Sequence, residues 1–301
     1  MKKFTITLAL SILAVLLVVT PCNAKGKAKH VVLIGLDGWG AYSVPKADIP
    51  TIKQLMADGA YTLEKRSALP SSSAINWASM FMGVGTELHG YTTWGSKTPE
   101  IPSREVNERG IAPTIFSVLR EQRPKAEIGC LYEWPGIKYL VDTLAMSYQY
   151  QTPGYAKAPT ALCEAAEKYI IEKKPELLAI CFEEPDHTGH TKGHDTPAYY
   201  QMLKELDGYV ERILQAIKKA GIWDDTIIIM TADHGGIKTG HGGKTLREME
   251  IPFIISGKNV RKGMEIKESM MQYDVASTIA YIFGLKQPQV WIGRPMKQVF
   301  K

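Results

Sequence analysis

Aspartates and histidines gather at three points of the sequence, each directly after a run of apolar residues. Carboxylates and neutral imidazoles are ligands for zinc and for other divalent ions of borderline softness. The set is larger than one tetrahedral ion requires, and it suits two ions that each keep open coordination positions. Two such ions can bind the attacking and leaving oxygens of an in-line phosphoryl transfer. The candidate ligands are Asp37, Asp186, His190, Asp233, His234 and His241.

Ser73 adds a candidate nucleophile to this set. It is the third of three consecutive serines, and it precedes a helix predicted over 76–82. The free N–H groups and the dipole at a helix N-terminus favour an anion such as a phosphate, and a bound metal would lower the pKa of a serine hydroxyl. Taken alone, Ser73 could equally be a helix cap, and Ser71 or Ser72 could take its place.

The apolar runs before these residues are typical of strands buried on both faces. They are continuous Val, Ile and Leu segments, as in a parallel sheet covered by helices. In such sheets ligands bind beyond the carboxyl ends of the strands. We therefore predict an α/β fold with a mostly parallel central sheet and helices on both faces. The predicted strands cover 30–36, 61–69, 127–132, 177–182, 226–231 and 251–255, and the predicted helices cover 51–57, 76–82, 113–121, 159–173, 197–220 and 275–283.

A single domain over 25–301 is the simplest division, because the chain contains no internal repeat, low-complexity tract or linker. The least regular stretch, 86–112, is rich in Gly, Thr, Ser and Pro. It is too long for a passive connection, so we expect a functional loop or a small cap there.

The motifs in this order resemble the alkaline phosphatase superfamily, and within it the type I phosphodiesterase/nucleotide pyrophosphatase branch. The resemblance covers roughly 30–256. It rests on Leu-Asp-Gly at 36–38, Leu-Pro-Ser-Ser-Ser-Ala-Ile-Asn at 69–76, Glu-Leu-His-Gly at 87–90, Trp-Pro-Gly at 134–136, Glu-Pro-Asp-His-Thr-Gly-His at 184–190, Ala-Asp-His-Gly-Gly at 232–236 and Gly-His-Gly-Gly at 240–243.

The resemblance implies an alkaline phosphatase-like fold, two divalent ions, which we expect to be Zn²⁺, and a small phosphate-ester substrate. One ion would be held by Asp186, His190 and His241. The other would be held by Asp37, Asp233 and His234, with Ser73 bound to it as the nucleophile. Asn76 and the Ser73 backbone N–H would contact the phosphoryl oxygens. The implied reaction has two steps, with a phosphoserine intermediate that a water molecule then hydrolyses.

Two departures from the branch keep other functions open. His241 follows His234 by only seven residues and Ile-Pro-Phe follows at 251–253, a spacing similar to phosphatase and mutase relatives. The nucleophile loop reads Ser-Ala-Ile-Asn at 73–76, where the branch usually has Thr-Phe-Pro-Asn. An alkaline phosphatase-like phosphomonoesterase is therefore the first alternative, and a non-catalytic metal- or ligand-binding protein of the same fold is the second. The Cys-x-Pro-x-Arg signature of sulfatases is absent.

Composition excludes several classes of protein. The 301 residues are 45% apolar and 22% charged, which excludes a disordered, a collagen-like or a polytopic membrane chain. The net charge of +5 falls to +3 without residues 1–24, because they hold two lysines and no acidic residue. No run of five basic residues remains, so we expect no nucleic-acid surface.

The first 24 residues predict a secretory signal peptide. Two lysines precede an apolar run over 4–19 and a small-residue exit that ends at Ala24. The run is shorter than the roughly 20 residues of a membrane-spanning helix, so we expect cleavage, no stable membrane span afterwards, and export to the periplasm or outside the cell. Pro21 argues against a lipoprotein anchored through Cys22. The oligomeric state stays open.

Overall fold

The computed structural model describes residues 26–153 and 159–301. The predicted signal peptide, with Cys22, lies outside the described residues. Eight strands of the described chain form one sheet in the order β4-β3-β5-β1-β6-β7-β2-β8. Only the pairings of β7 with β6 and with β2 are antiparallel. The strands are β1 His30–Leu36, β2 Gly59–Arg66, β3 Ile128–Tyr132, β4 Tyr148–Gln151, β5 Leu177–Phe182, β6 Thr226–Thr231, β7 Glu250–Gly257 and β8 Met264–Glu265.

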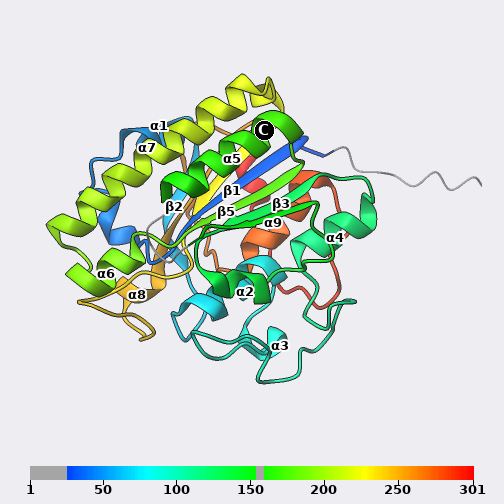
Figure 1. Ribbon diagram of the computed structural model, residues 1–301, viewed down its shortest axis with the longest axis horizontal. Coiled ribbons are helices and arrows are strands. Elements are labelled where there is room, and N and C mark those ends of the chain that lie inside the picture. Colours follow the sequence, from blue (N-terminus) through cyan, green and yellow to red (C-terminus); the bar gives the residue numbers. More distant parts are fainter. Residues whose placement is uncertain (1–25, 154–158) are drawn as a thin grey trace, which may run out of the picture.

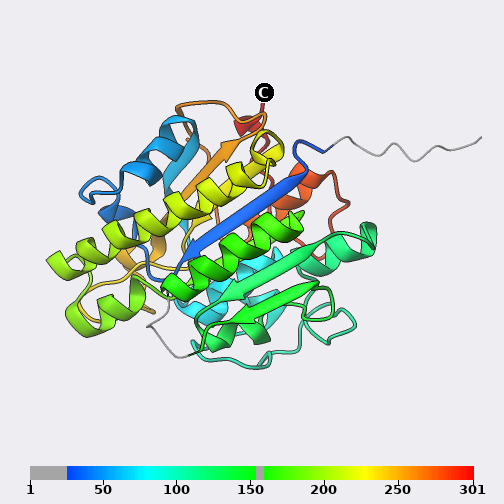
Figure 2. The same ribbon diagram turned by 45° about the horizontal axis from the view of Figure 1, so that its top comes forward.

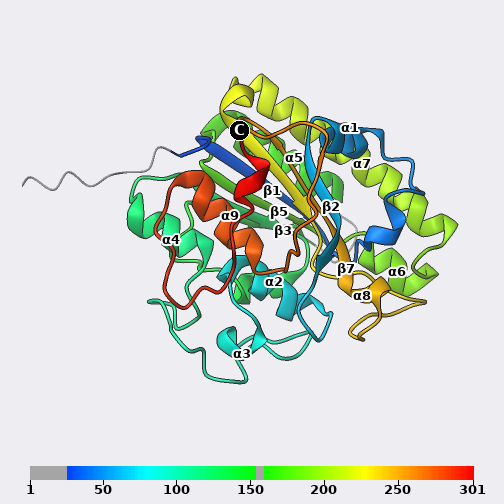
Figure 3. The same ribbon diagram turned by 180° about the vertical axis from the view of Figure 1, so that it is seen from behind.

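Helices cover both faces of this sheet, which confirms the predicted fold class. On one face lie α1, α5 and α7, with α5 and α7 side by side (Figures 1 and 2). On the other face lie α2, α4 and α9, seen from behind in Figure 3. The helices are α1 Pro50–Ala57, α2 Ser73–Met82, α3 Thr86–His89, α4 Ile115–Gln122, α5 Pro159–Lys173, α6 Asp186–Lys192, α7 Pro197–Lys219, α8 Leu246–Met249 and α9 Asp274–Phe283.

The central strands are buried on both sides, as their unbroken apolar sequences predict. In β1, Val31 and Leu33 belong to the core under α2, α4 and α9, while Val32 and Ile34 belong to the core under α5 and α7. Side chains alternate between the faces of a strand, so a strand with helices on both sides has to be apolar at every position. None of the helices in the described ranges is long and apolar enough to cross a membrane.

The three strands that precede the candidate ligands are neighbours in the middle of the sheet. β1 lies between β5 and β6 and is parallel to both, with Leu36 opposite Phe182 and Gly35 opposite Thr231. The carboxyl ends of these strands therefore meet at one edge. The short helices α6 and α8 lie at that same end of the molecule (Figure 1).

Several predicted boundaries shift by a few residues. The helix predicted from residue 76 begins at Ser73. The strand predicted over 61–69 runs from Gly59 to Arg66. The helix predicted from Pro113 begins at Ile115, because Thr114 caps it through a reciprocal bond pair with Ser117. The segment after β5, for which no element was predicted, contains the helix α6.

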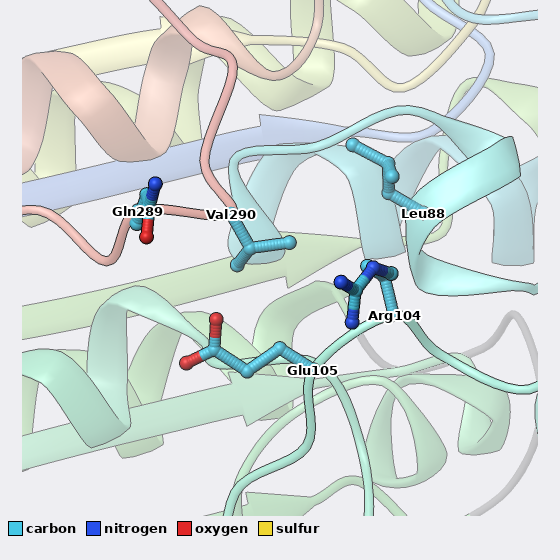
Figure 4. A pocket seen from close by; sticks show the side chains of 5 residues that line it. All are labelled: Leu88, Arg104, Glu105, Gln289 and Val290. Carbon is cyan, nitrogen blue, oxygen red and sulfur yellow. The ribbon is translucent and has the colours of Figure 1, made fainter.

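The stretch 86–112 contains the one-turn helix α3 and is otherwise irregular. It exposes the side chains of Trp94, Ile101 and Val106. A hollow between this stretch and the segment near residue 290 is lined by Leu88, Arg104, Glu105, Gln289 and Val290 (Figure 4). None of these residues belongs to the Asp/His set, so this hollow is separate from the predicted chemistry.

Candidate metal centre

The three aspartates are buried at the shared edge of β5, β1 and β6. The backbone ties their segments together, because the N–H of Asp186 donates to the carbonyl of Asp37 (3.0 Å) and the N–H of Asp37 donates to the carbonyl of Phe182 (3.0 Å). Residues that are distant in sequence therefore meet at the ends of adjacent strands, as predicted.

Each aspartate has a buried carboxylate oxygen without a hydrogen-bond donor: Oδ1 of Asp37, Oδ1 of Asp186 and Oδ2 of Asp233. The other oxygen of Asp37 accepts from Nε1 of Trp77 (3.2 Å). The other oxygen of Asp233 accepts from the N–H groups of Gly38 (3.1 Å) and His234 (2.8 Å). Buried carboxylate oxygens normally have partners, so the free oxygens of Asp37 and Asp233 suit a bound cation.

The three predicted histidine ligands are oriented in the same way. In each, Nδ1 faces a backbone carbonyl, Thr239 O for His190 (2.9 Å), Gly235 O for His234 (2.8 Å) and Ser71 O for His241 (3.1 Å). A carbonyl only accepts, so Nδ1 carries the proton. Nε2 is then the nitrogen that can bind a metal in the neutral ring, which is the usual arrangement of metal-ligating histidines.

One group of ligand atoms forms around Asp186. Its Oδ2 lies 3.1 Å from Nε2 of His190 and 3.8 Å from Nε2 of His241. Asp186 and His190 are one turn apart on α6, so their side chains share a face. The ligand atoms of these three residues all lie within 4.8 Å of one another, which matches the ligand set predicted for the first ion.

A second group forms around Nε2 of His234, which lies 3.4 Å from Oδ1 of Asp37, 3.3 Å from Oδ2 of Asp233 and 3.1 Å from Oγ of Ser73. Asp186 adjoins this group as well, because its ligand atom lies within 4.8 Å of those of Asp37 and His234. The stacked rings of His234 and His241, with centroids 3.8 Å apart, join the two groups.

Burial and charge make this centre unfavourable for three free carboxylates. Burial, and then the neighbouring Asp233 and Asp186, raise the pKa of Asp37 well above its ordinary value. Burial and the charge of Asp186 raise the pKa of Asp233 to about 8. Burial lowers the pKa of His234 to about 3, with His241 adding to the effect, so this imidazole is neutral. Divalent cations would relieve the repulsion and bind the free oxygens.

Ser73 is the first residue of α2, and its side chain is buried beside His234. Ser72 precedes the helix as its N-cap residue. The hydroxyl of Ser71 is used elsewhere, because it donates to the carbonyl of Gly243 (2.7 Å). Of the three serines, Ser73 is therefore the one whose hydroxyl joins the second ligand group.

Residues 31–261 match the sequence model of the family described as type I phosphodiesterase / nucleotide pyrophosphatase. The chain belongs to this family. The match confirms the resemblance indicated by the motifs, and every predicted metal ligand lies within the matched residues.

The curated relatives of this chain are named for several activities. Bis(5'-adenosyl)-triphosphatase enpp4 of Xenopus laevis is 24% identical over 236 residues, which are 74% of this chain and 52% of the relative. A phosphopentomutase of Herpetosiphon aurantiacus is 38% identical over 129 residues, which are 42% of this chain and 31% of the mutase. The chain spans about half the length of the enpp4 relatives.

Solved structures show the same fold. Murine ectonucleotide pyrophosphatase / phosphodiesterase 5 in complex with AMP superposes with a TM-score of 0.73 at 16% identity, over 91% of this chain and 100% of that one. A 2-O GAG sulfatase superposes with a TM-score of 0.72 at 14% identity, over 91% of this chain and 74% of that one. At these identities the likeness establishes the alkaline phosphatase-like fold alone.

Asn76 has a different environment from the one predicted by family resemblance. Its Oδ1 accepts from the N–H of Ala68 (2.7 Å), and its Nδ2 donates to the carbonyls of Ala68 (3.1 Å), Pro70 (3.2 Å) and Ser72 (3.1 Å). The amide is fully buried and its donors and acceptor are engaged. This geometry gives no support to a phosphate contact, and it shows Asn76 holding the loop that precedes Ser73.

Sequence reasoning missed the residues that orient the ligands. Trp77 lies one turn after Ser73 and resembles an ordinary apolar core residue in the sequence. Gly38 adopts a positive φ of 69°, and a Cβ there would lie 2.6 Å from Oδ1 of Asp186. The buried ring of His194 lies against Asp186. The sequence signal for Gly38 and His194 is their closeness to the ligands, because Gly38 directly follows Asp37 and His194 comes four residues after His190.

Proposed function

We propose that this chain is a metal-dependent hydrolase of phosphoric esters, acting as a phosphodiesterase or nucleotide pyrophosphatase with Ser73 as its nucleophile. The observation that carries the proposal is the position of the Ser73 hydroxyl. It lies at the start of α2 and 3.1 Å from Nε2 of His234, beside the free oxygens of Asp37 and Asp233. A plain helix cap would not need these ligands around it.

Two divalent ions fit the ligand groups, and we expect zinc because the donors are carboxylate oxygens and imidazole nitrogens. Asp186, His190 and His241 would hold one ion. Asp37, Asp233, His234 and Ser73 would hold the other. When bound, the ions would act as Lewis acids that neutralise phosphoryl charge and lower the pKa of the serine hydroxyl and of a water molecule.

The chain's own residues would carry out a double displacement. The Ser73 hydroxyl gives up its proton to solvent and Oγ forms a bond to phosphorus, while the bond from phosphorus to the leaving oxygen breaks and the leaving group takes up a proton from solvent. A water molecule then attacks the phosphoryl group on Ser73 and loses a proton, the Ser73 oxygen leaves and regains a proton, and the product is released. The N–H groups at the start of α2 favour the phosphoryl oxygens throughout.

The proposed substrate is a small nucleotide diester or pyrophosphate. Support comes from the family match and from relatives whose names refer to adenosine nucleotides. The phosphomonoesterase alternative keeps specific support, because the short spacing from His234 to His241 resembles that of mutases and a phosphopentomutase matches part of the chain. The non-catalytic alternative is disfavoured by Ser73, which a binding protein would not require.

We further propose that the protein is exported to the periplasm or secreted after cleavage of residues 1–24, and that the remaining residues act as one domain. The composition of the first 24 residues supports export, and the single sheet of the described residues supports one domain. N-terminal sequencing of the exported protein would test the cleavage, and limited proteolysis of the mature protein would test the single domain.

The function is tested by comparing three chromogenic esters on the zinc-loaded protein: bis(p-nitrophenyl) phosphate, a thymidine p-nitrophenyl phosphodiester and p-nitrophenyl phosphate. We expect the nucleotide diester to have the highest kcat/KM. A preference of a hundredfold or more for the monoester would replace the diesterase proposal with the phosphomonoesterase. No turnover of any ester, with metal bound, would favour the non-catalytic protein.

A further inference from the structure

His194 is a buried histidine with two unpartnered nitrogens beside the metal centre. Its side chain is fully buried, and neither Nδ1 nor Nε2 has a hydrogen-bond partner. Nε2 lies 3.7 Å from Oδ1 of Asp186, which is itself a buried oxygen without a donor. A buried donor and a buried acceptor that face each other without other partners are each costly alone. Their closest available partners are one another.

The backbone leaves a fitted space for this ring. A Cβ added at Gly189 or at Gly236 would lie 2.3 Å from Cε1 of His194, so only glycine fits at both positions. The ring packs on that of Tyr199, with centroids 5.4 Å apart. The backbone N–H of His194 donates to the carbonyl of Lys238 (2.6 Å), which fixes the backbone from which the ring extends. The ring is therefore held against Asp186 from several sides.

The two oxygens of Asp186 face different neighbours. Oδ2 faces Nε2 of His190 and of His241, the other ligand atoms of the first group. Oδ1 is turned to His194. A hydrogen bond to one oxygen of a carboxylate fixes the direction of the other oxygen. Trp77 donates such a bond to Asp37, and the backbone N–H of Gly38 donates one to Asp233. His194 would give Asp186 the same kind of support.

We infer that His194 is a positioning residue for the first metal ion, donating from Nε2–H to Oδ1 of Asp186 so that Oδ2 is aimed at the ion. The inference rests on the proposed function, since it assumes that this group binds a metal. Residues that orient a metal ligand in this way typically contribute tenfold to a hundredfold to metal affinity.

The inference is tested by measuring zinc dissociation constants of the full chain by competition with a chromophoric chelator. His194→Ala removes the donor, whereas His194→Gln places an amide N–H near the position of Nε2. His30→Ala is the control for loss of an imidazole, because the His30 ring bonds to a backbone carbonyl (Pro175 O, 2.8 Å) and lies outside the ligand groups. Melting temperatures in excess chelator report on the metal-free fold.

We expect His194→Ala to weaken one of two zinc sites by tenfold or more, His194→Gln to restore most of that loss, and His30→Ala to bind as the unaltered chain does. Equal zinc affinity in His194→Ala would overturn the inference. A Gln variant as weak as the Ala variant would overturn it too, because it would indicate that the imidazole binds the ion directly. A purely structural role would lower the melting temperature in chelator of both variants without changing zinc affinity.

A second variant keeps the test decisive if His194→Ala folds poorly. Gly236→Ala would push the His194 ring aside, so we expect it to weaken the same zinc site, and to have no further effect when combined with His194→Ala. Additive losses in the double variant would contradict the inference. If the unaltered chain binds no zinc at all, the proposed function fails, and that outcome is distinct from each of those above.

Discussion

The hydroxyl oxygen of Ser73 lies 3.1 Å from Nε2 of His234, across 161 positions of sequence. The relationship joins the start of α2 to the end of β6, and it brings the candidate nucleophile into the ligand group formed with Asp37 and Asp233. Because Nδ1 of His234 donates to a backbone carbonyl, its Nε2 has a free lone pair. One ion could therefore be shared by the imidazole and the serine oxygen.

Ser73→Ala should abolish turnover while leaving metal binding nearly intact. We expect kcat to fall by about a thousandfold or more, since removing the serine nucleophile of a protease has an effect at least that large. Steady-state rates and metal content by mass spectrometry check this. Ser71→Ala is the matched control, because its hydroxyl bonds to the carbonyl of Gly243. Unchanged turnover by Ser73→Ala would remove Ser73 from the mechanism.

Metal affinity should increase with pH between 6 and 9. The hydrogen bond to Asp186 raises the pKa of His190 to about 9, and burial raises that of Asp233 to about 8. At pH 7 the metal-free protein holds a proton at each position, and a binding ion must displace it. Affinity should therefore rise by about tenfold per pH unit for each displaced proton, and level off above pH 9.

Proton release during a zinc titration in dilute buffer measures this linkage directly. At pH 7 we expect protons to be released as each equivalent of zinc binds. Release that is absent at pH 7, with affinity constant from pH 6 to 9, would show that these groups are already deprotonated in the metal-free protein.

Trp77→Phe should weaken the site that contains Asp37. The substitution keeps most of the buried aromatic surface but removes the Nε1 donor to Oδ2 of Asp37 (3.2 Å). We expect a loss of roughly tenfold in affinity for one ion, measured by chelator competition. Trp39→Phe is the control, since that buried indole N–H has no hydrogen-bond partner. Equal losses in both variants would indicate a packing effect.

Asn76→Ala should lower stability more than it changes chemistry. It removes an amide that bonds to the backbone of Ala68, Pro70 and Ser72. Leaving those buried groups unpaired should reduce the free energy of unfolding by about 2–3 kcal/mol, measured by urea denaturation in chelator. A variant of normal stability with a greatly raised KM would instead support the phosphate contact first expected for Asn76.

The elements that were predicted most accurately are those whose apolar residues follow one simple pattern. The strands β1, β5 and β6 and the helix α5 were predicted to the residue, because each is bounded by turn residues and is either uniformly apolar or clearly periodic. The edge strand β4, Tyr148–Gln151, was missed, because its half-exposed sequence has no apolar run. Its pairing with β3 depends on tertiary context.

The candidate ligands were predictable because their side-chain types and their positions after buried strands agree. The groups that orient these ligands were not predictable, because an indole, a backbone N–H or a second histidine acts through geometry that only the fold creates. His194 shows the difference: in the sequence it is one of several histidines near a motif, and only the folded chain places it against Asp186. For Asn76, family resemblance suggested a phosphate contact, whereas the folded chain engages its amide with the backbone of the preceding loop.

Rapid-quench mass spectrometry of the zinc-loaded protein tests the central proposal most directly. Protein in excess over a nucleotide diester is quenched in acid during the first turnover, and the peptide that contains Ser73 is examined for a phosphoryl adduct. We predict an adduct on Ser73 that forms as the leaving group is released and then decays, and that is absent in chelator. Stoichiometric product with Ser73 unmodified at every quench time would contradict the account.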